Sequence, residues 1–252
     1  MNNNEFNADA ASLSVDLSEA RQAVKENRFQ DALDLFEIIL ETDPDHIDSL
    51  YLVSVSSRYL KKFDESRKYI ERLLFIAPDM GRAYQELGHI YRDMGNLAKA
   101  AIHYRQACEL NPALLASWNS LYKYFVESKN KPAADHAREQ IEKLQSLPPA
   151  LLYIDQIMNE GRLGIAETQC RAFLKKNPTH TYAMSLLSEI ANRLGYFDDA
   201  EFLLEKAVEF EPKDGELRMK YAQILRKKQK FAETMEQVNI SVSYTHLRAH
   251  ET

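Results

Sequence analysis

The spacing of the prolines constrains this chain more than any other feature of its sequence. Pro44, Pro78 and Pro112 recur with a period of 34, and Pro178 and Pro212 are separated by the same interval. Pro112 and Pro178 are 66 positions apart, which is one period of 34 residues and one of 32 residues. A fixed period between roughly 20 and 50 residues indicates a stack of structural repeats. We therefore expect about seven repeats, one of which has lost its proline and two residues.

The best-preserved repeat begins at Gly81 and shows which residues recur with the proline. Its key positions are Tyr84, Leu87, Gly88, Tyr91, Ala100 and Tyr104, followed by Pro112. In type and spacing these residues resemble the tetratricopeptide (TPR) repeat. The resemblance implies two antiparallel helices per repeat, A and B, which meet where Gly88 and Ala100 leave room. The proline closes helix B, because it cannot continue the hydrogen-bond ladder of a helix.

The same register predicts the organisation of the whole chain. We expect an all-α fold, a right-handed α-solenoid of about seven TPR helix-turn-helix units over residues 13–240, with units starting near 13, 47, 81, 115, 147, 181 and 215. Residues 1–12 are rich in Asn and have little to bury, so we expect a disordered lead-in. Residues 241–252 resemble a cloning or sequencing scar. We expect this tail to be non-native and the natural chain to continue past residue 240.

The turns between helices A and B carry a second signal. Gly95, Gly161 and Gly195 fall at these turns, where the residue after a helix often needs a positive φ. Asn27 takes the same place in the first unit, and asparagine tolerates that conformation. We therefore predict a left-handed backbone at these four positions.

Composition excludes several classes of function. The net charge of −6 gives no basic footprint for nucleic acid. No stretch approaches the ~18 apolar residues of a membrane span, and the N-terminal residues do not resemble a secretory signal. The two cysteines, Cys108 and Cys170, cannot form a disulfide framework and are predicted to be buried, inert thiols. We expect a cytoplasmic protein that binds neither nucleic acid nor membrane.

Catalytic motifs are also missing from the sequence. It contains no Gly-Lys-Ser/Thr phosphate loop, no Gly-x-Ser-x-Gly and no His-Glu-x-x-His. His246 and His250 have the spacing of a metal pair on a helix, but both lie in the suspect tail. We therefore predict no catalytic residue, no cofactor and no metal in this fragment.

The candidate binding surface is the concave wall that helices A would line, since such arrays bind partners there. The register places six polar residues of the predicted groove on inner faces: Arg58, Arg82, His89, Arg92, Asn119 and Lys123. Arg21 and Lys25 precede them, and Glu86, Asp93 and Glu127 share the wall. The functional hypothesis is capture of a peptide or partner segment, acidic or carboxylate-bearing, by these donors. The alternative is a generic solvated inner face. The Lys/Asn arrangement of TPR carboxylate-clamp co-chaperones does not match residue for residue.

A further resemblance covers residues 147–240. The segments RLGIAETQCRAFLKKNP, LLSEIANRLGYFDDAEFLLEKAVEFEP and RMKYAQILRKKQKFAETMEQVN are similar to the N-terminal half of bacterial TPR-containing sulfotransferases. That resemblance implies a following domain that moves a sulfuryl group from a phosphosulfate nucleotide. Two hypotheses therefore stand: a non-enzymatic TPR scaffold that binds segments in its groove, or the truncated recognition half of a sulfotransferase. The sequence predicts no oligomeric state.

Overall fold

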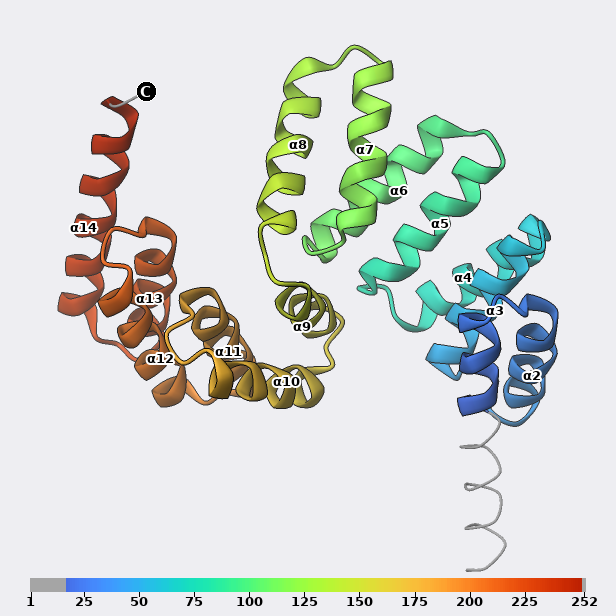
Figure 1. Ribbon diagram of the computed structural model, residues 1–252, viewed down its shortest axis with the longest axis horizontal. Helices are drawn as coiled ribbons and strands as arrows, with labels where there is room; N and C mark the ends of the chain where they lie inside the picture. The colour runs from blue at the N-terminus through green and yellow to red at the C-terminus, as the bar shows by residue number, and fades with distance from the viewer. Residues whose placement is uncertain (1–16, 251–252) are drawn as a thin grey trace, which may run out of the picture. The chain divides into compact units, whose positions relative to one another are not determined.

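The computed structural model describes residues 17–250, with side chains described as far as Val242. The predicted lead-in, residues 1–12, lies outside the described residues. Within the described range all regular structure is helical, and consecutive helices form hairpins (Figure 1). The predicted all-α fold is confirmed. The helices divide into two compact units, unit 1 up to Ser146 and unit 2 from Leu147.

Unit 1 contains four helical hairpins. They are the segment 17–25 with α2 (Phe29–Thr42), α3 (Ile47–Tyr59) with α4 (Phe63–Ile76), α5 (Gly81–Asp93) with α6 (Leu97–Leu110), and α7 (Leu115–Glu127) with α8 (Lys131–Gln145). Its buried side chains form clusters that each join a hairpin to its neighbour. Phe36 of α2 lies in one cluster with Val53 of α3, and Leu50 of α3 lies in the next with Leu87 of α5. Stacking therefore buries a core that no single hairpin could bury alone.

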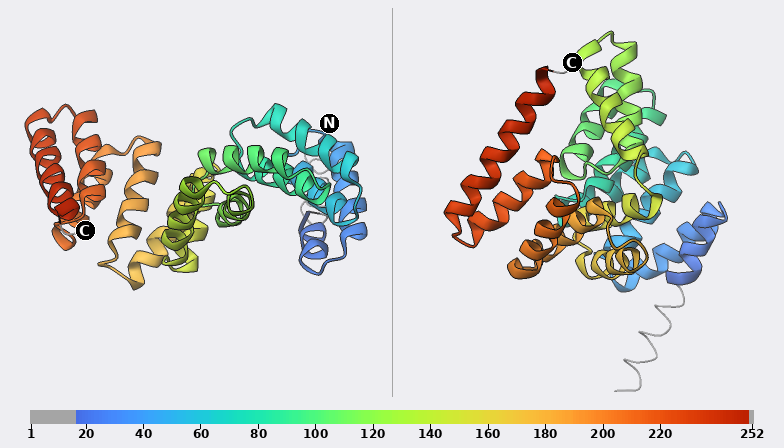
Figure 2. Two further views of the ribbon diagram at one scale, coloured as in Figure 1. Left: turned by 90° about the horizontal axis from the view of Figure 1, so that it is seen from above. Right: turned by 60° about the vertical axis from the view of Figure 1, so that its left-hand side comes forward.

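Unit 2 contains three helical hairpins. They are α9 (Pro149–Asn159) with α10 (Leu163–Lys176), α11 (Thr181–Leu194) with α12 (Phe197–Phe210), and α13 (Gly215–Lys227) with α14 (Phe231–His250). The same rule of packing holds, because Ile154 of α9 shares a cluster with Ile190 of α11. Leu204 of α12 shares the next with Ile224 of α13. Figure 2 shows the hairpins of each unit following one another in order.

The prolines mark the ends of helices B as the sequence indicates. Each periodic proline stands two residues after the last residue of such a helix, as Pro112 does after Leu110 of α6. In the unit without that proline, α8 ends at Gln145 and Pro149 opens α9 instead. α14 runs to His250 and so continues past residue 240, where the apolar pattern of the sequence stops.

The turns between helices A and B all contain one residue with positive φ. Gly95, Gly161, Gly195 and Asn27 have φ of 80°, 77°, 84° and 60°, which confirms the four predicted positions. Lys61, Lys129 and Gln229 occupy the same turn in the remaining units, with φ of 62°, 57° and 60°. These three were not predicted, because neither lysine nor glutamine favours the left-handed region. None of the described helices is long and apolar enough to cross a membrane.

Candidate functional site

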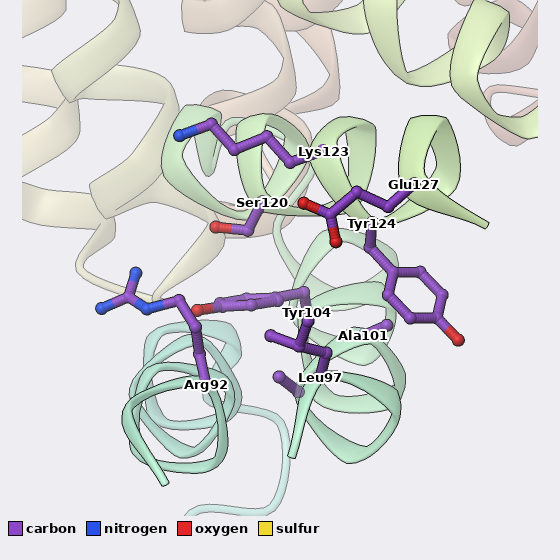
Figure 3. A pocket seen from close by; sticks show the side chains of 9 residues that line it. Arg92, Leu97, Ala101, Tyr104, Ser120, Lys123, Tyr124 and Glu127 are labelled. Atoms are coloured by element: carbon purple, nitrogen blue, oxygen red, sulfur yellow. The ribbon is translucent and has the colours of Figure 1, made fainter. Parts of the chain in front are cut away.

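A cavity of about 200 Å³ opens in unit 1 between α5, α6 and α7. We call it the α6 pocket, and Figure 3 shows it from close by. One face of α6 supplies Leu97, Ala100, Ala101 and Tyr104, one face of α7 supplies Ser120, Lys123, Tyr124 and Glu127, and α5 supplies Arg92. On both α6 and α7 the four residues are spaced i, i+3, i+4 and i+7, which places them on one side of a helix. Ala100, Ala101 and Tyr104 are buried in this lining, whereas Leu97 and the charged side chains of Arg92, Lys123 and Glu127 are exposed.

Tyr104 fixes the depth of the α6 pocket. Its side chain is buried, and Gly88 of α5 lies against its ring. A Cβ atom at position 88 would stand 2.6 Å from Tyr104 Cε1, so only glycine leaves room for this ring. The expectation that a small residue at 88 lets helices A and B approach is confirmed.

The hydroxyl of Tyr104 is paired inside the wall. It lies 2.6 Å from Nδ1 of His89. Burial, together with the nearby charges of Arg58 and Arg92, lowers the pKa of His89 to about 3. Burial also raises the pKa of Tyr104. Nη1 of Arg92, which can only donate, lies 3.3 Å from the same nitrogen, so Nδ1 is the acceptor and the hydroxyl donates to it.

Arg92 is held at the mouth of the pocket by Asp93. Its Nε and Nη2 atoms donate to Asp93 Oδ1 over 2.9 Å and 2.8 Å, and its side chain remains 42% exposed. The other oxygen of Asp93 accepts from Arg58 Nη1 at 3.0 Å. Burial alone would raise the pKa of Asp93, but bonds from Arg92 and Arg58 hold it below its usual value. Asp93 therefore stays ionised and orients Arg92, whose guanidinium lies beside the Tyr104 hydroxyl in Figure 3.

Lys123 supplies the second cation of the pocket. Its side chain is exposed and makes no ion pair with any residue between 17 and 242. Figure 3 shows its ammonium group extending past Ser120, on the same side as Arg92. Glu127 lies one helical turn further along α7, and in Figure 3 its carboxylate reaches back towards Ser120. The lining of the α6 pocket thus combines two cations, one carboxylate and three hydroxyl side chains with apolar groups of α6.

Arg58 lies differently from the sequence-based prediction. Its side chain is 8% exposed, and its Nε lies 2.5 Å from Oε1 of Glu86, which is 2% exposed. With its second bond to Asp93, Arg58 ties α3 to α5 and does not stand free on the groove wall. Moving it away from Glu86 to meet a partner would leave a buried carboxylate without a counter-charge. As a correction to the predicted groove, Arg58 is therefore left out of the candidate site.

The other predicted groove residues divide into two groups. Arg92 and Lys123 line the α6 pocket, and His89 stands behind it as the acceptor for Tyr104. Arg82 lies over the ring of Tyr51, with its guanidinium carbon 4.6 Å from the ring centroid. Asn119 uses its amide within α7, where Nδ2 donates to the carbonyl of Leu115 at 2.9 Å. Arg82 and Asn119 therefore do not line the cavity.

The lining residues on α6 are absent from the sequence-based prediction, which assigns binding to helices A alone. The repeat pattern identifies Ala100 and Tyr104 only as packing positions, and it does not single out Leu97 or Ala101. The i, i+3, i+4, i+7 spacing of these four residues was the available signal, because it predicts one continuous face on α6. The sequence could not predict the cavity beside that face, because the cavity depends on the distance between α6 and α7.

The imidazole of His89 stands behind the wall of the α6 pocket, and its Nδ1 lies 2.6 Å from the Tyr104 hydroxyl. No group of three His, Cys, Asp or Glu side chains in the described part of the chain could hold a metal ion. Cys108 and Cys170 are buried as predicted, and burial raises the pKa of each to about 12. The arrangement is suited to binding.

Comparison with known proteins identifies the repeats. Residues 81–114 and 182–214 match the family model of the tetratricopeptide repeat. A stretch of 101 residues is 30% identical to anaphase-promoting complex subunit 8 of Arabidopsis thaliana. It covers 39% of this chain and 17% of that protein, so the chain spans about a sixth of the length of the relative it matches. TPR repeats are thus present in this chain.

Solved structures of low identity also resemble this chain. A tetratricopeptide repeat protein from Parabacteroides merdae is 12% identical, with a TM-score of 0.47 and coverage of 93% of both chains. A chain from the structure of Naa15/Naa10 bound to HypK-THB is 17% identical, with a TM-score of 0.48. The match covers 93% of this chain and 39% of that one. With its stacked hairpins and matched repeats, the fold is an α-solenoid of TPR helix-turn-helix units, as predicted.

Proposed function

We propose that this chain is a TPR scaffold without catalysis, and that it binds a segment of a protein partner at the α6 pocket. The observation that carries the proposal is that two cations, Arg92 and Lys123, line the same cavity together with apolar side chains. TPR arrays are typically interaction scaffolds, and a partner segment would lie where helix B of one unit, α6, faces helix A of the next, α7. The segment we infer is acidic.

Charge and burial together favour this choice of partner. Lys123 makes no ion pair within residues 17–242, and Arg92 keeps 42% of its side chain exposed although it contacts Asp93. Each can donate to a carboxylate, while the buried lining formed by Ala100, Ala101 and the ring of Tyr104 can receive an apolar side chain. Because these cations are exposed, salt will weaken their contribution.

A direct test uses a fluorescein-labelled peptide of glutamates and aspartates with a single leucine. The double variant Arg92→Gln, Lys123→Gln should weaken its binding about tenfold, the loss of roughly 1.4 kcal/mol. Fluorescence anisotropy at low salt and at physiological salt measures the affinity. Arg58 stays unchanged, because its loss would strand the buried Glu86 and confuse binding with unfolding.

The matched control removes two exposed cations elsewhere on the chain. Arg105→Gln on α6 and Lys175→Gln on α10 change the net charge equally but do not touch the α6 pocket. We expect this control to bind the peptide like the unchanged chain. Equal affinity of all three proteins, with unchanged circular dichroism, would show that Arg92 and Lys123 belong only to a solvated face.

The sulfotransferase hypothesis is the second candidate, and one observation favours it. The segment that resembles those enzymes starts at Leu147, and unit 2 also starts at Leu147. In this alternative the fragment is the recognition half of an enzyme whose catalytic domain follows residue 240. Sequencing the gene past that codon tests it and also shows whether residues 241–252 are native. A phosphate-binding strand, loop and helix would support the alternative, whereas a stop codon or more repeats would remove it.

We also propose a cytoplasmic location. Cys108 and Cys170 are free thiols, which fits a reducing compartment. Cell fractionation with an antibody against the chain would test this location, and recovery in a secreted or membrane fraction would contradict it.

A further inference from the structure

A second cavity in unit 1 lies on the other side of α7. It has a volume of about 340 Å³, and we call it the α8 pocket. Its lining is Tyr122, Phe125, Val126 and Lys129 from α7 and its turn, and Lys131, Ala134, Asp135 and Arg138 from α8. These residues have no part in the proposed function.

The two pockets occupy the same position in successive repeats. Val126, Lys131, Ala134, Asp135 and Arg138 stand one repeat period after Arg92, Leu97, Ala100, Ala101 and Tyr104, the α5 and α6 lining of the first pocket. The α7 segment contributes four residues to each pocket, and those of the α8 pocket follow those of the α6 pocket by two positions, as Tyr122 follows Ser120. Two positions are about 200° around a helix, so the sets lie on opposite flanks of α7. α7 is therefore the wall between two repeat-related cavities.

Both cavities are lined by apolar and basic side chains. In the α8 pocket Arg138 is paired with Asp135 at 2.8 Å. Lys129 and Lys131 are exposed, and neither forms an ion pair with the residues described from 17 to 242. Across both linings the basic side chains outnumber the acidic ones, whereas the whole chain has a net charge of −6. This local reversal of sign favours an acidic occupant.

We propose that the α6 and α8 pockets are consecutive anchor sites for one extended acidic segment that crosses α7 and places an apolar side chain in each. The proposal rests on the proposed function and adds the spacing of the ligand. One helix with its side chains is about 10 Å across. A chain in the polyproline II conformation advances about 3.1 Å per residue and returns to the same face every third residue. The two apolar residues are therefore about three positions apart, with acidic residues around them.

The probe is a labelled acidic peptide with two leucines separated by two acidic residues. Its controls have the same composition of acids but one leucine replaced by serine, or the two leucines placed next to each other. Two anchors on one chain act at a high effective concentration. We expect the spaced peptide to bind at least tenfold more tightly than either control, as measured by fluorescence anisotropy.

One substitution separates binding from folding in the α8 pocket. Lys129→Gly removes a cation from the pocket and also relieves a positive φ of 57°. The variant should therefore raise the unfolding midpoint while it weakens the spaced peptide several-fold. Lys61→Gly is the matched control: it relieves the same turn of another unit, at φ 62°, and lines neither pocket. It should be stabilised without any change in affinity.

The outcomes distinguish the two proposals. If the spaced peptide binds no better than its one-leucine control, or Lys129→Gly behaves like Lys61→Gly, the two-anchor inference is wrong. If the double variant Arg92→Gln, Lys123→Gln still weakens the binding of every acidic peptide in that case, the proposed function stands and only the two-anchor inference fails. If that double variant changes nothing, the proposed function fails first and the two-anchor inference fails with it.

Discussion

At the residue scale, the turn between helices A and B demands a left-handed residue whatever the sequence supplies. Gln229 holds φ of 60° there, which costs a non-glycine residue about 1–2 kcal/mol. Gln229→Gly should therefore stabilise unit 2 by about 0.5–1 kcal/mol, after the greater freedom of glycine in the unfolded chain is counted. Gly195→Ala should have the opposite effect of similar size, because a Cβ there meets nothing within 4 Å and only the φ of 84° opposes it. Urea unfolding measures both.

His89 gives a pH dependence whose sign follows from its burial. Its pKa is about 3 in the folded chain and about 6.5 when unfolded, so the unfolded state takes up the proton first. The stability that neutral His89 contributes is complete above about pH 6.5 and is lost as pH falls from there towards 3. Between about pH 7.5 and pH 5 we expect a loss of ~2 kcal/mol from this group.

The control for this prediction is His89→Gln, whose side-chain oxygen can still accept from the Tyr104 hydroxyl. Urea unfolding of the variant at the two pH values should show a flatter dependence. Asp93 does not confuse the comparison: its pKa is lowered, so its own contribution is lost only below its unfolded value of about 3.9. An equally steep dependence in the variant would contradict the assignment.

At the element scale, α3 and α5 are joined by the buried ion pair of Arg58 and Glu86. Arg58→Met should cost about 3–5 kcal/mol, because Glu86 is left charged and buried without its partner. Arg58→Met together with Glu86→Leu should recover most of that loss, since no unpaired charge then remains. A double-mutant cycle from urea unfolding measures the coupling. Additive losses would mean that the pair does not tie the two helices.

The elements also show what the sequence could and could not predict. Pro112 and Gly95 predicted a helix end and a turn because each has one dominant backbone preference. Lys129 has no such preference, so its left-handed turn was invisible although it holds the same repeat position as Gly95. The repeat register predicted Arg58 on the groove wall. It could not show that Arg58 forms a buried ion pair with Glu86, which lies 28 residues later. Contacts between elements depend on packing distances, which a periodic pattern does not contain.

At the scale of the whole chain, each unit has its own buried clusters. Leu87 belongs to a cluster of unit 1 and Ile190 to a cluster of unit 2. The stability of stacked repeats is approximately a sum of nearest-neighbour terms, so a change in one unit has little reason to reach the other. Transitions seen by different probes then need not coincide.

Trp118 makes this testable, because it is the single tryptophan of the chain and lies on α7 in unit 1. Its fluorescence reports the unfolding of unit 1, whereas far-ultraviolet circular dichroism reports helices of both units. We expect Arg58→Met to lower the urea midpoint of the fluorescence transition and to leave a second, unshifted transition in circular dichroism. Gln229→Gly in unit 2 should shift only that second transition. If both probes instead report one midpoint that moves with either substitution, the two units unfold as one cooperative body.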